Sequence, residues 1–590
     1  MSNEIIKGGS FLIEDAENIS IFTPEDFTEE QRMIAKTAED YVAGEVVPVI
    51  EDLEAQKEGL MKKLIQGAGE LGLLAADIPE EYEGMGLDKI SSILITEKVA
   101  GGASYAVGHS AHTGIGTLPI VFFGTEEQKK KYLPGLASGE LIAAYALTEP
   151  SAGSDALAAK TKAVLNEDGT KYILNGEKIF ITNAGFADVF VTYAKIDGEH
   201  FTAFIVDADS PGLSTGAEEK KLGIKGSSTR SVIFEDCEVP VENVLGEIGK
   251  GHLVAFNILN IGRYKLAAAA VGAGKIGLET SVKYAKERKQ FNQSIAEFGL
   301  IKQKIGEMAT RLYAAESVVY RTGGLIDDIL SHLDPTAEDA GRSAANAIAE
   351  YAMECSINKI YGSEVVDYIV DEAVQIHGGY GFTQEYPVER YYRDSRINRI
   401  FEGTNEINRL LIPQTLLRKA MKGELPLLAA AQKLMGELLG MMPTQPEGTL
   451  GVEFAKLANM KKMFLMTAGT AVQKMGMALK DQQEILANVA DMIIEIFALE
   501  SALIRTKQAI AATGEEANQM KINMTKLYAH NAIQKCELIA KNTLAAVDSG
   551  DALKTQLSAL KKMVRFELEN TVALRRAIAD VIIEEEKYTC

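Results

Sequence analysis

The residue of this sequence with the clearest capacity for acid–base chemistry is Glu402, which lies in the segment Arg399-Ile-Phe-Glu-Gly-Thr-Asn-Glu-Ile-Asn-Arg409. A glutamate between an apolar residue and a glycine can act as a general base if the fold holds it beside a reacting group. The same spacing also fits a carboxylate that only marks a helix end. The spacing alone leaves both interpretations open.

Three other segments combine hydroxyl, aromatic and glycine residues in patterns that suit ligand binding. Tyr145-Ala-Leu-Thr-Glu-Pro-Ser-Ala-Gly-Ser-Asp155 has the composition of a loop, and loops on a rigid scaffold often carry binding groups. An ordinary turn with a helix cap would look the same. The glycines in Gln375-Ile-His-Gly-Gly-Tyr-Gly-Phe382 would let the backbone approach a ligand closely. The remaining segment is Lys178-Ile-Phe-Ile-Thr-Asn-Ala-Gly185.

Gly272, Gly274 and Gly277 match the GxGxxG pattern that holds a dinucleotide pyrophosphate between a strand and a helix. They lie inside an alanine-rich helical stretch, and no strand precedes them. Close packing between helices explains these glycines better, so the sequence argues against NAD binding.

The elements that must position these segments follow from local patterns. Thr28 and Gln31 have the spacing of a capping box and precede apolar residues at helical intervals, so the first ~140 residues are expected to be mostly helical. Between about Leu147 and Val244 the apolar residues form runs of strand length. These runs are Val189–Ala194, Phe201–Val206 and Ser231–Phe234. Asn175-Gly176, between two further apolar runs, predicts a type I′ hairpin turn.

Helical composition returns at Gly262 and continues almost to the end of the chain. A break near Met441–Gly451, rich in proline and glycine, separates a final helical block. The order is therefore helical, small β, helical, helical. Because the strands do not alternate with helices, the fold class is α+β and mainly α.

Composition narrows the class of protein. With 590 residues, the chain exceeds what one hydrophobic core usually supports, so several packed domains are expected. The formal net charge is −22 and no basic run stands out, which argues against a nucleic-acid partner. The N-terminus lacks the pattern of a secretory signal and no apolar run has membrane-spanning length, so an intracellular, cytoplasmic protein is expected. The four cysteines are too scattered for a metal site or a disulfide framework.

Taken together and in this order, the four segments resemble the acyl-CoA dehydrogenase family, and the resemblance runs from about Phe27 to Leu417. The block past Met441 resembles the additional C-terminal helical domain of the very-long-chain subgroup. The implied domains are an N-terminal helical domain at 27–145, a central β-barrel at 146–260, a four-helix bundle at 261–420, a linker at 421–450 and the additional helical domain at 451–590.

The resemblance implies FAD as the cofactor, held between domains and across a dimer interface. The contacts implied for one subunit are Tyr145, Leu147, Thr148, Ser154, Phe180, Thr182, Thr404 and Glu406. The contacts implied for the neighbouring subunit's FAD are Arg288, Phe291, Gln375, Gly378 and Gly379. The family usually has tryptophan where Phe180 stands, so the aromatic wall is kept without an indole N–H.

By the same resemblance, Glu402 is the base that removes the α-hydrogen of a fatty acyl thioester. In the family, the backbone N–H of this glutamate and a ribityl hydroxyl of FAD stabilise the enolate-like charge, as an oxyanion hole does. Some members carry the base immediately before the arginine that is Arg263 here, but this chain has Gly262, so Glu402 has no rival. The residues implied to contact acyl-CoA are Ser154, Asn260, Arg263 and Gly403.

The implied activity is conversion of fatty acyl-CoA to trans-2-enoyl-CoA, with a long-chain preference and an electron-transfer flavoprotein as acceptor. One residue argues against a long-chain preference. In the very-long-chain subgroup a second glycine deepens the acyl cavity, and Pro119 occupies that position here, three residues after Gly116. Two alternatives remain. One is an acyl-CoA oxidase that passes electrons to oxygen, and the other is an assembly protein that kept the fold without catalysis.

The resemblance also predicts a homodimer, because the additional domain would cover the face through which smaller members pair into tetramers. Peripheral membrane contact is a further hypothesis for Phe454–Leu479, where several lysines accompany apolar residues. The alternative for this segment is a helix packed on its own domain.

Overall fold

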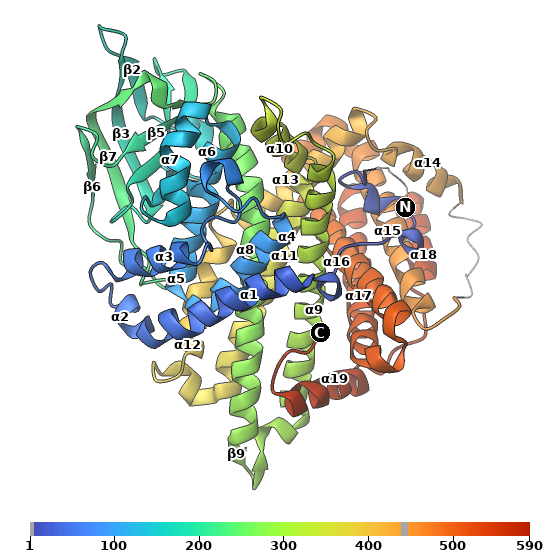
Figure 1. Cartoon of the computed structure of the whole chain (residues 1–590). Helices are drawn as coiled ribbons and strands as arrows, with labels where there is room; N and C mark the ends of the chain where they lie inside the picture. The colour runs from blue at the N-terminus through green and yellow to red at the C-terminus, as the bar shows by residue number, and fades with distance from the viewer. Residues whose placement is uncertain (1–4, 438–445) are drawn as a thin grey trace.

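The computed structural model describes residues 5–437 and 446–590, and it confirms the α+β class with helices in the majority. Figure 1 shows N-terminal helices and a sheet on one side, long helices in the middle, and the C-terminal helices on the other side. The two halves of the chain are therefore joined through the long central helices.

The N-terminal region is helical, as its apolar spacing predicts. Thr28 caps α1 (Glu29–Tyr41), since its hydroxyl accepts the N–H of Gln31 while the Gln31 side-chain oxygen accepts the N–H of Thr28. The predicted capping box is confirmed. The other helices here are α2 (Ile50–Glu54), α3 (Leu60–Glu70), α4 (Lys89–Val99), α5 (Ser104–Ser110), α6 (Leu118–Phe123) and α7 (Glu126–Ser138).

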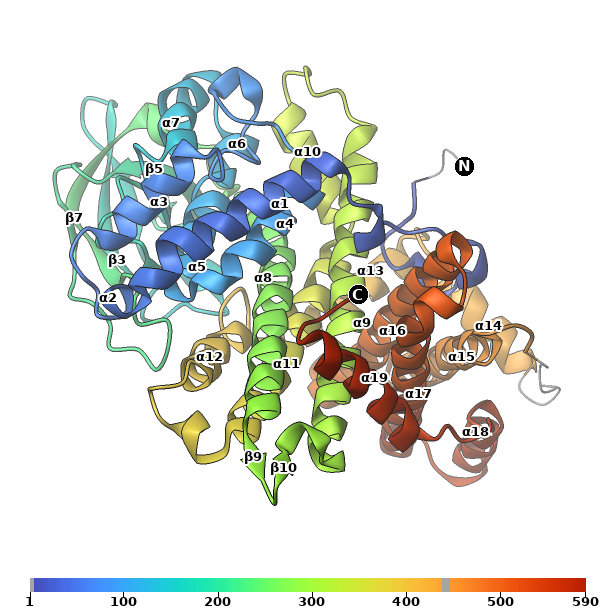
Figure 2. The same ribbon diagram turned by 60° about the horizontal axis from the view of Figure 1, so that its bottom comes forward.

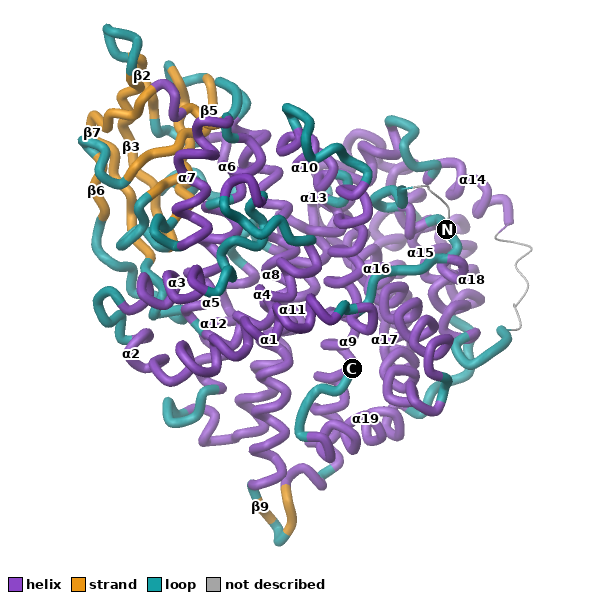
Figure 3. Tube along the Cα trace, viewed as in Figure 1, coloured by secondary structure: helices purple, strands orange, loops and turns teal. Residues whose placement is uncertain are grey.

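The middle region is one eight-stranded sheet, which contains most of the orange segments of Figure 3. The main strand order is β6-β7-β3-β2-β4-β5-β8, with β1 paired to β4. In this region, where a barrel was expected, β6 and β8 are therefore the two ends of the strand order. The three predicted strand runs are confirmed, in β4, β5 and β7. The strands are β1 (Ala143–Ala146), β2 (Lys162–Leu165), β3 (Lys171–Thr182), β4 (Val189–Ile196), β5 (His200–Asp207), β6 (Leu213–Thr215), β7 (Thr229–Pro240) and β8 (Val244–Leu245).

The predicted hairpin turn at Asn175-Gly176 is wrong. Both residues lie inside β3, which continues through the dipeptide, and the register with β7 shifts between Leu174 and Gly176 as in a β-bulge. A Cβ on Gly176 would lie 2.5 Å from Oγ1 of Thr161. The glycine therefore allows a close approach of Thr161 at a bulge instead of a chain reversal.

Three long helices form the middle of the molecule: α8 (Gly251–Glu287), α9 (Gly299–Ser331) and α11 (Ala352–His377). α8 begins inside the segment expected to be the barrel, and it holds the GxGxxG glycines. A Cβ on Gly272 would lie 2.0 Å from the carbonyl oxygen of Glu97, so glycine lets α8 and α4 come this close. The shorter helices of this region are α10 (Ala340–Ala349), α12 (Val388–Ser395) and α13 (Asn405–Met421).

The C-terminal helices form the additional helical region that the sequence predicts. The first of them, α14, lies inside the interval 421–450 that was expected to be a linker, and residues 438–445 of that interval are outside the described part of the chain. The helices are α14 (Leu427–Glu437), α15 (Gly451–Met475), α16 (Gln483–Thr513), α17 (Gln519–Val547), α18 (Gly550–Met563) and α19 (Thr571–Glu585).

Helix α15 turns two of its lysines inward, which contradicts their use in membrane contact. Lys456 is buried beside Glu453, and Lys461 is buried with its Nζ 2.5 Å from a carboxylate oxygen of Glu500. These contacts support the alternative of a helix packed on its own domain. Across residues 5–437 and 446–590, no helix combines the length and the apolar character needed to cross a bilayer.

The N-terminal segment before α1 connects the C-terminal helices to the rest of the chain. Figure 2 shows this dark blue segment beside the C-terminal helices before it enters α1. The ring of Phe11 packs on that of Phe497 with their centroids 4.7 Å apart. The backbone of Ile21 exchanges hydrogen bonds of 2.9 and 3.0 Å with the side chain of Gln508.

Arg505 in α16 lies where these parts meet, and its side chain is fully buried. It donates hydrogen bonds to Glu316 of α9 (2.7 Å) and to Glu25 of the N-terminal segment (2.9 Å). The hydroxyl of Tyr588, near the C-terminus, also donates to Glu316 at 2.9 Å. One guanidinium therefore links three distant parts of the chain. Removing it would leave Glu316 with Lys275 alone and Glu25 with Lys521 alone as paired cations.

Replacing Arg505 with glutamine is expected to destabilise the fold by about 3 kcal/mol, because Glu316 and Glu25 would lose a shared buried cation. Differential scanning calorimetry should show a melting temperature several degrees lower. Lys554→Gln is the control, since its pair with Asp551 is exposed and such pairs contribute little. Equal melting temperatures for the two variants would contradict the structural role of Arg505.

Candidate active site

Glu402 lies in a loop between α12 and α13 that has an unusual backbone. Glu402 and Gly403 have φ angles of +58° and +79°, in the left-handed region that residues other than glycine rarely occupy. The side chain of Asn408 folds back and donates to the carbonyl oxygens of Gly403 (2.9 Å) and Thr404 (3.1 Å). Strain of this kind persists where surrounding contacts hold it, so the geometry at Glu402 is imposed by its neighbours.

The carboxylate of Glu402 points against α8 at Gly262. A Cβ built on Gly262 would lie 2.6 Å from Oε2 of Glu402, so glycine is needed there to make room. Oε2 is buried and has no hydrogen-bond partner within the described residues. Burial raises the pKa of Glu402 to about 7, while the charges of Arg263 and Lys359 act to lower it. A carboxylate with such a pKa suits a general base near neutral pH.

Arg263 and Asn260, both expected near the acyl-CoA, lie on the same part of α8. Nη1 of Arg263 donates to Oδ1 of Asn260 (3.0 Å), and Nε donates to the carbonyl oxygen of Glu402 (3.3 Å). Both side chains are buried. Arg263 therefore holds the backbone of the Glu402 loop and supplies positive charge beside its carboxylate.

Lys359 of α11 is a second cation of the site, and the sequence interpretation missed it. It is fully buried, and its Nζ donates to Oδ1 of Asn405 at 2.6 Å. Burial lowers the pKa of Lys359 to about 7, against the opposing effect of Glu402. Lys359 and its partner Asn405 are 46 positions apart in the sequence, so no local pattern connects them. Only the packing of α11 on α13 could reveal the contact.

The end of β1 lines the site from the sheet side. Tyr145 is buried with its ring edge-on to Tyr193, 5.4 Å between centroids, and burial together with the charge of Glu402 raises its pKa. Leu147 is buried too, and its carbonyl oxygen accepts a hydrogen bond from Nζ of Lys178 (3.1 Å). The carbonyl oxygen of Thr148 accepts the N–H of Ile179 at 2.8 Å, which joins this loop to β3.

A buried ion pair fixes the loop that follows β1. Both partners lie in the segments singled out from the sequence, but no role was predicted for either of them. Nζ of Lys178 lies 2.7 Å from Oε1 of Glu149, and neither side chain is exposed. The same carboxylate accepts the N–H groups of Lys160 and Thr161. Ser154, at the far end of the loop, is exposed. The pair therefore anchors the start of the loop and leaves Ser154 open to a ligand.

Phe180 projects from β3 where the strand is irregular. Its φ angle is +58°, the register with β7 shifts between Lys178 and Ile181, and 61 % of the side chain is exposed. Two residues on, Thr182 pairs with Thr229 of β7. An exposed aromatic side chain offers a face on which a flat ligand ring can stack, so Phe180 and Thr182 fit the flavin implied by the resemblance.

Thr404 immediately precedes α13, and Glu406 lies in the first turn of this helix. The hydroxyl of Thr404 accepts the N–H of Ile407 at 3.2 Å and so caps the helix. Glu406 is exposed. The cap of this helix is therefore Thr404, and the carboxylate of Glu402, for which a helix-end role was the alternative, lies against Gly262 of α8.

The remaining predicted cofactor residues gather at the opposite end of α8. Phe291 and Asn292, with φ angles of +53° and +64°, form the turn between β9 (Lys289–Gln290) and β10 (Gln293–Ser294), and Phe291 is 88 % exposed. The guanidinium of Arg288 lies over the ring of Tyr380, 5.5 Å from its centroid. The exposed residues Gln375, Gly378 and Gly379 flank this tyrosine in α11 and the turn after it.

This second group cannot complete the site around Glu402 within one chain. At 1.5 Å per residue, Arg288 lies roughly 38 Å from Arg263 along α8. A Cβ on Gly378 or Gly379 would meet nothing within 4 Å. Open backbone, an exposed aromatic residue and a cation fit a cofactor that comes from another subunit.

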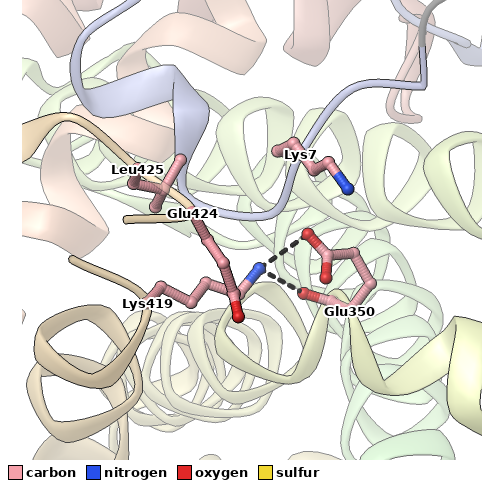
Figure 4. Close-up of a pocket in the computed structure, with 5 residues that line it drawn as sticks. All are labelled: Lys7, Glu350, Lys419, Glu424 and Leu425. Carbon is pink, nitrogen blue, oxygen red and sulfur yellow. Dashed lines mark hydrogen bonds and ion pairs between the residues drawn. The ribbon is translucent and has the colours of Figure 1, made fainter. Parts of the chain in front are cut away.

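The structure also has a cavity of about 390 Å³ far from this chemistry, where the N-terminal segment passes α13 (Figure 4). Its lining residues are Lys7, Glu350, Lys419, Glu424 and Leu425, and Nζ of Lys419 lies 2.7 Å from Oε1 of Glu350. None of the predicted site residues lines it. Its main cation and its main anion neutralise each other, so the cavity has no evident chemical role.

Comparison with known proteins gives matches along most of the chain. Models of acyl-CoA dehydrogenase domains match at residues 28–140 (N-terminal), 144–237 (middle) and 249–417 (C-terminal), and a further C-terminal domain model matches at 459–562. A probable acyl-CoA dehydrogenase of Bacillus subtilis (strain 168) is 59% identical over 99% of both chains. The mitochondrial very long-chain specific acyl-CoA dehydrogenase of Homo sapiens is 37% identical and covers 78% of this chain and 72% of its own.

A solved structure agrees over the whole length. The crystal structure of acyl-CoA dehydrogenase complexed with FAD from Bacillus anthracis has a TM-score of 0.98 and 57% identity, covering 99% of this chain and 100% of that one. These matches include the segments that hold Glu402, Arg263 and the Phe180 strand. The chain therefore belongs to the acyl-CoA dehydrogenase family.

Proposed function

We propose that this enzyme uses FAD to oxidise the α,β bond of a fatty acyl-CoA, giving the trans-2-enoyl-CoA, with Glu402 as the base. The observation that carries the proposal is the Glu402 carboxylate. Its Oε2 is buried and has no hydrogen-bond partner in the described part of the chain, and burial raises the pKa of the group to about 7 beside two cations. A purely structural carboxylate in such a place would be paired or hydrogen-bonded.

In this proposal the chain's own residues prepare the removal of the α-proton. Glu402 takes the proton on a carboxylate oxygen, and desolvation makes that oxygen a stronger base than it would be in water. The N–H of Glu402 would donate to the thioester carbonyl and stabilise the charge that develops there. Arg263 holds the carbonyl of the same peptide segment. Bound FAD supplies the acceptor for the β-hydride.

The residues proposed to hold FAD come from two chains. Tyr145, Thr148, Phe180 and Thr182 would contact it on one subunit, and Arg288, Phe291, Gln375 and the glycine pair would reach it from the second. The length of α8 between Arg263, beside Glu402, and Arg288, together with the exposure of Phe291, supports a homodimer. An electron-transfer flavoprotein is the proposed acceptor, and no observation favours oxygen over it.

A preference for long acyl chains is the finer part of the proposal. It is supported by the match of residues 459–562 to the further C-terminal domain model and by the likeness to very long-chain specific enzymes. Pro119, buried in the first turn of α6, is the local argument against a deep acyl cavity. Catalysis is favoured over a role as an assembly protein because Glu402 is kept in an energetically unfavourable state.

Glu402→Gln should fold and bind FAD, yet reduce its flavin roughly 10²–10⁴-fold more slowly with acyl-CoA, because the base is lost while the backbone donor stays. Anaerobic stopped-flow absorbance measures the bleaching. Glu167→Gln, at an exposed turn, is the control and should bleach normally. Near-normal bleaching in Glu402→Gln, or loss of FAD on purification, would refute the role of Glu402.

The melting temperature of the same variant distinguishes a catalytic residue from a structural one. The folded-state pKa of about 7 is above the ordinary 4.5, so Glu402 costs stability increasingly as pH rises from about 4.5 through 7. At pH 8, therefore, Glu402→Gln should melt no lower than the wild type. A clear drop would show that the carboxylate stabilises the fold.

A substrate series from C4 to C18 acyl-CoA should give the highest kcat/KM at C14 or longer, because a long apolar chain gains roughly 0.8 kcal/mol of transfer free energy per buried methylene. An artificial electron acceptor gives the rate, and a hydrogen peroxide assay run beside it should find little peroxide. The highest kcat/KM at C4 or C6 would overturn the preference, and peroxide matching the turnover would identify an oxidase.

A further inference from the structure

An ion pair joins the additional C-terminal domain to α13, the helix that follows the active-site loop. Arg409 is the last residue of the Glu402 motif and lies in the second turn of α13. Its Nε donates to Oδ1 of Asp491 in α16 at 2.8 Å. Both side chains are mostly buried, with 18 % and 25 % of their surface exposed. An ion pair so shielded from water is screened little and holds its geometry.

Arg409 passes this restraint to the beginning of α13. Its two terminal nitrogens bind both oxygens of Glu364 in α11, at 2.7 and 3.0 Å. Oε1 of Glu364 also accepts Nδ2 of Asn405 at 3.1 Å. A fork-shaped pair of this kind fixes direction as well as distance. Asp491 therefore orients Arg409, which orients Glu364, which holds Asn405.

Asn405 is the residue from which the Glu402 loop departs. Its Oδ1 accepts Nζ of Lys359, the buried cation whose charge lowers the pKa of Glu402. The residues between Asn405 and Glu402 are the helix cap Thr404 and Gly403, which has a left-handed backbone. The carbonyl oxygens of the loop accept hydrogen bonds from Asn408, which lies in the first turn of α13, and from Arg263. The position of Glu402 therefore depends in part on how firmly Asn405 and the first turn of α13 are held.

We propose that Asp491 of the C-terminal domain is a positioning residue for Glu402, acting through Arg409, Glu364 and Asn405. The additional domain then contributes to the rate of the reaction and not only to the stability of the fold. This inference rests on the proposed function of Glu402. It gives the domain a role that does not depend on substrate length.

The test compares Asp491→Asn with the wild type, both loaded with FAD, in anaerobic stopped-flow reduction by palmitoyl-CoA. The limiting rate of flavin bleaching should fall roughly tenfold, since small misplacements of a reacting group are costly, while the Kd of palmitoyl-CoA changes less than twofold. Asp491→Glu should recover most of the rate, because its carboxylate can still pair with Arg409. An unchanged limiting rate in Asp491→Asn would overturn the proposal.

A matched control separates positioning from stability. Glu307 of α9 pairs with Arg575 of α19 at 3.1 Å and is similarly shielded, so it also links the C-terminal domain to the core but touches no part of the loop. Glu307→Gln should lower the melting temperature as much as Asp491→Asn and leave the bleaching rate unchanged. Equal loss of rate in both would refute a specific role for Asp491. A wild-type flavin that no acyl-CoA bleaches would instead refute the proposed function itself.

Discussion

The structure depends on keeping one carboxylate oxygen, Oε2 of Glu402, out of water without a partner among residues 5–437 and 446–590. Ionised carboxylates in protein interiors are normally paired, because desolvation is expensive. Glu402 is kept by a left-handed backbone at two successive residues, by a glycine on α8 that makes room for its oxygens, and by hydrogen bonds to its loop from Arg263 and Asn408. The cations Arg263 and Lys359 limit the cost without forming a direct ion pair with it.

The domains around this loop each contribute a different restraint. α8 supplies Gly262 and Arg263, α11 supplies Lys359, and the sheet closes the site with Tyr145. The additional C-terminal helices reach the same place through Arg409, and they are bound to the core by the buried Arg505 network. A site assembled from so many parts of the chain requires their relative positions to be fixed, which explains the buried ion pairs between them.

Local sequence patterns predicted the features that depend on neighbouring residues. The capping box of Thr28 and Gln31 and the three strand runs are of this kind, and the apolar–Glu–Gly spacing marked Glu402. The hairpin turn predicted at Asn175-Gly176 was wrong, because a bulge packed closely on Thr161 requires a glycine just as such a turn does. Lys359 was not predicted because its role arises only when α11 packs on α13. The family resemblance, and not spacing, separated the catalytic from the capping interpretation of the Glu402 motif.

We propose that Glu402 acts as a base whose pKa the fold raises. The most direct test of this role is the pH dependence of flavin bleaching by acyl-CoA, measured by anaerobic stopped flow in the FAD-loaded protein. The groups that face Glu402 are Arg263, Lys359 and Tyr145, and the two cations oppose the effect of burial. Because the base must be ionised, the limiting rate should rise with pH through about 7 and then level off. A rate that is already constant from pH 5 upward would contradict the account.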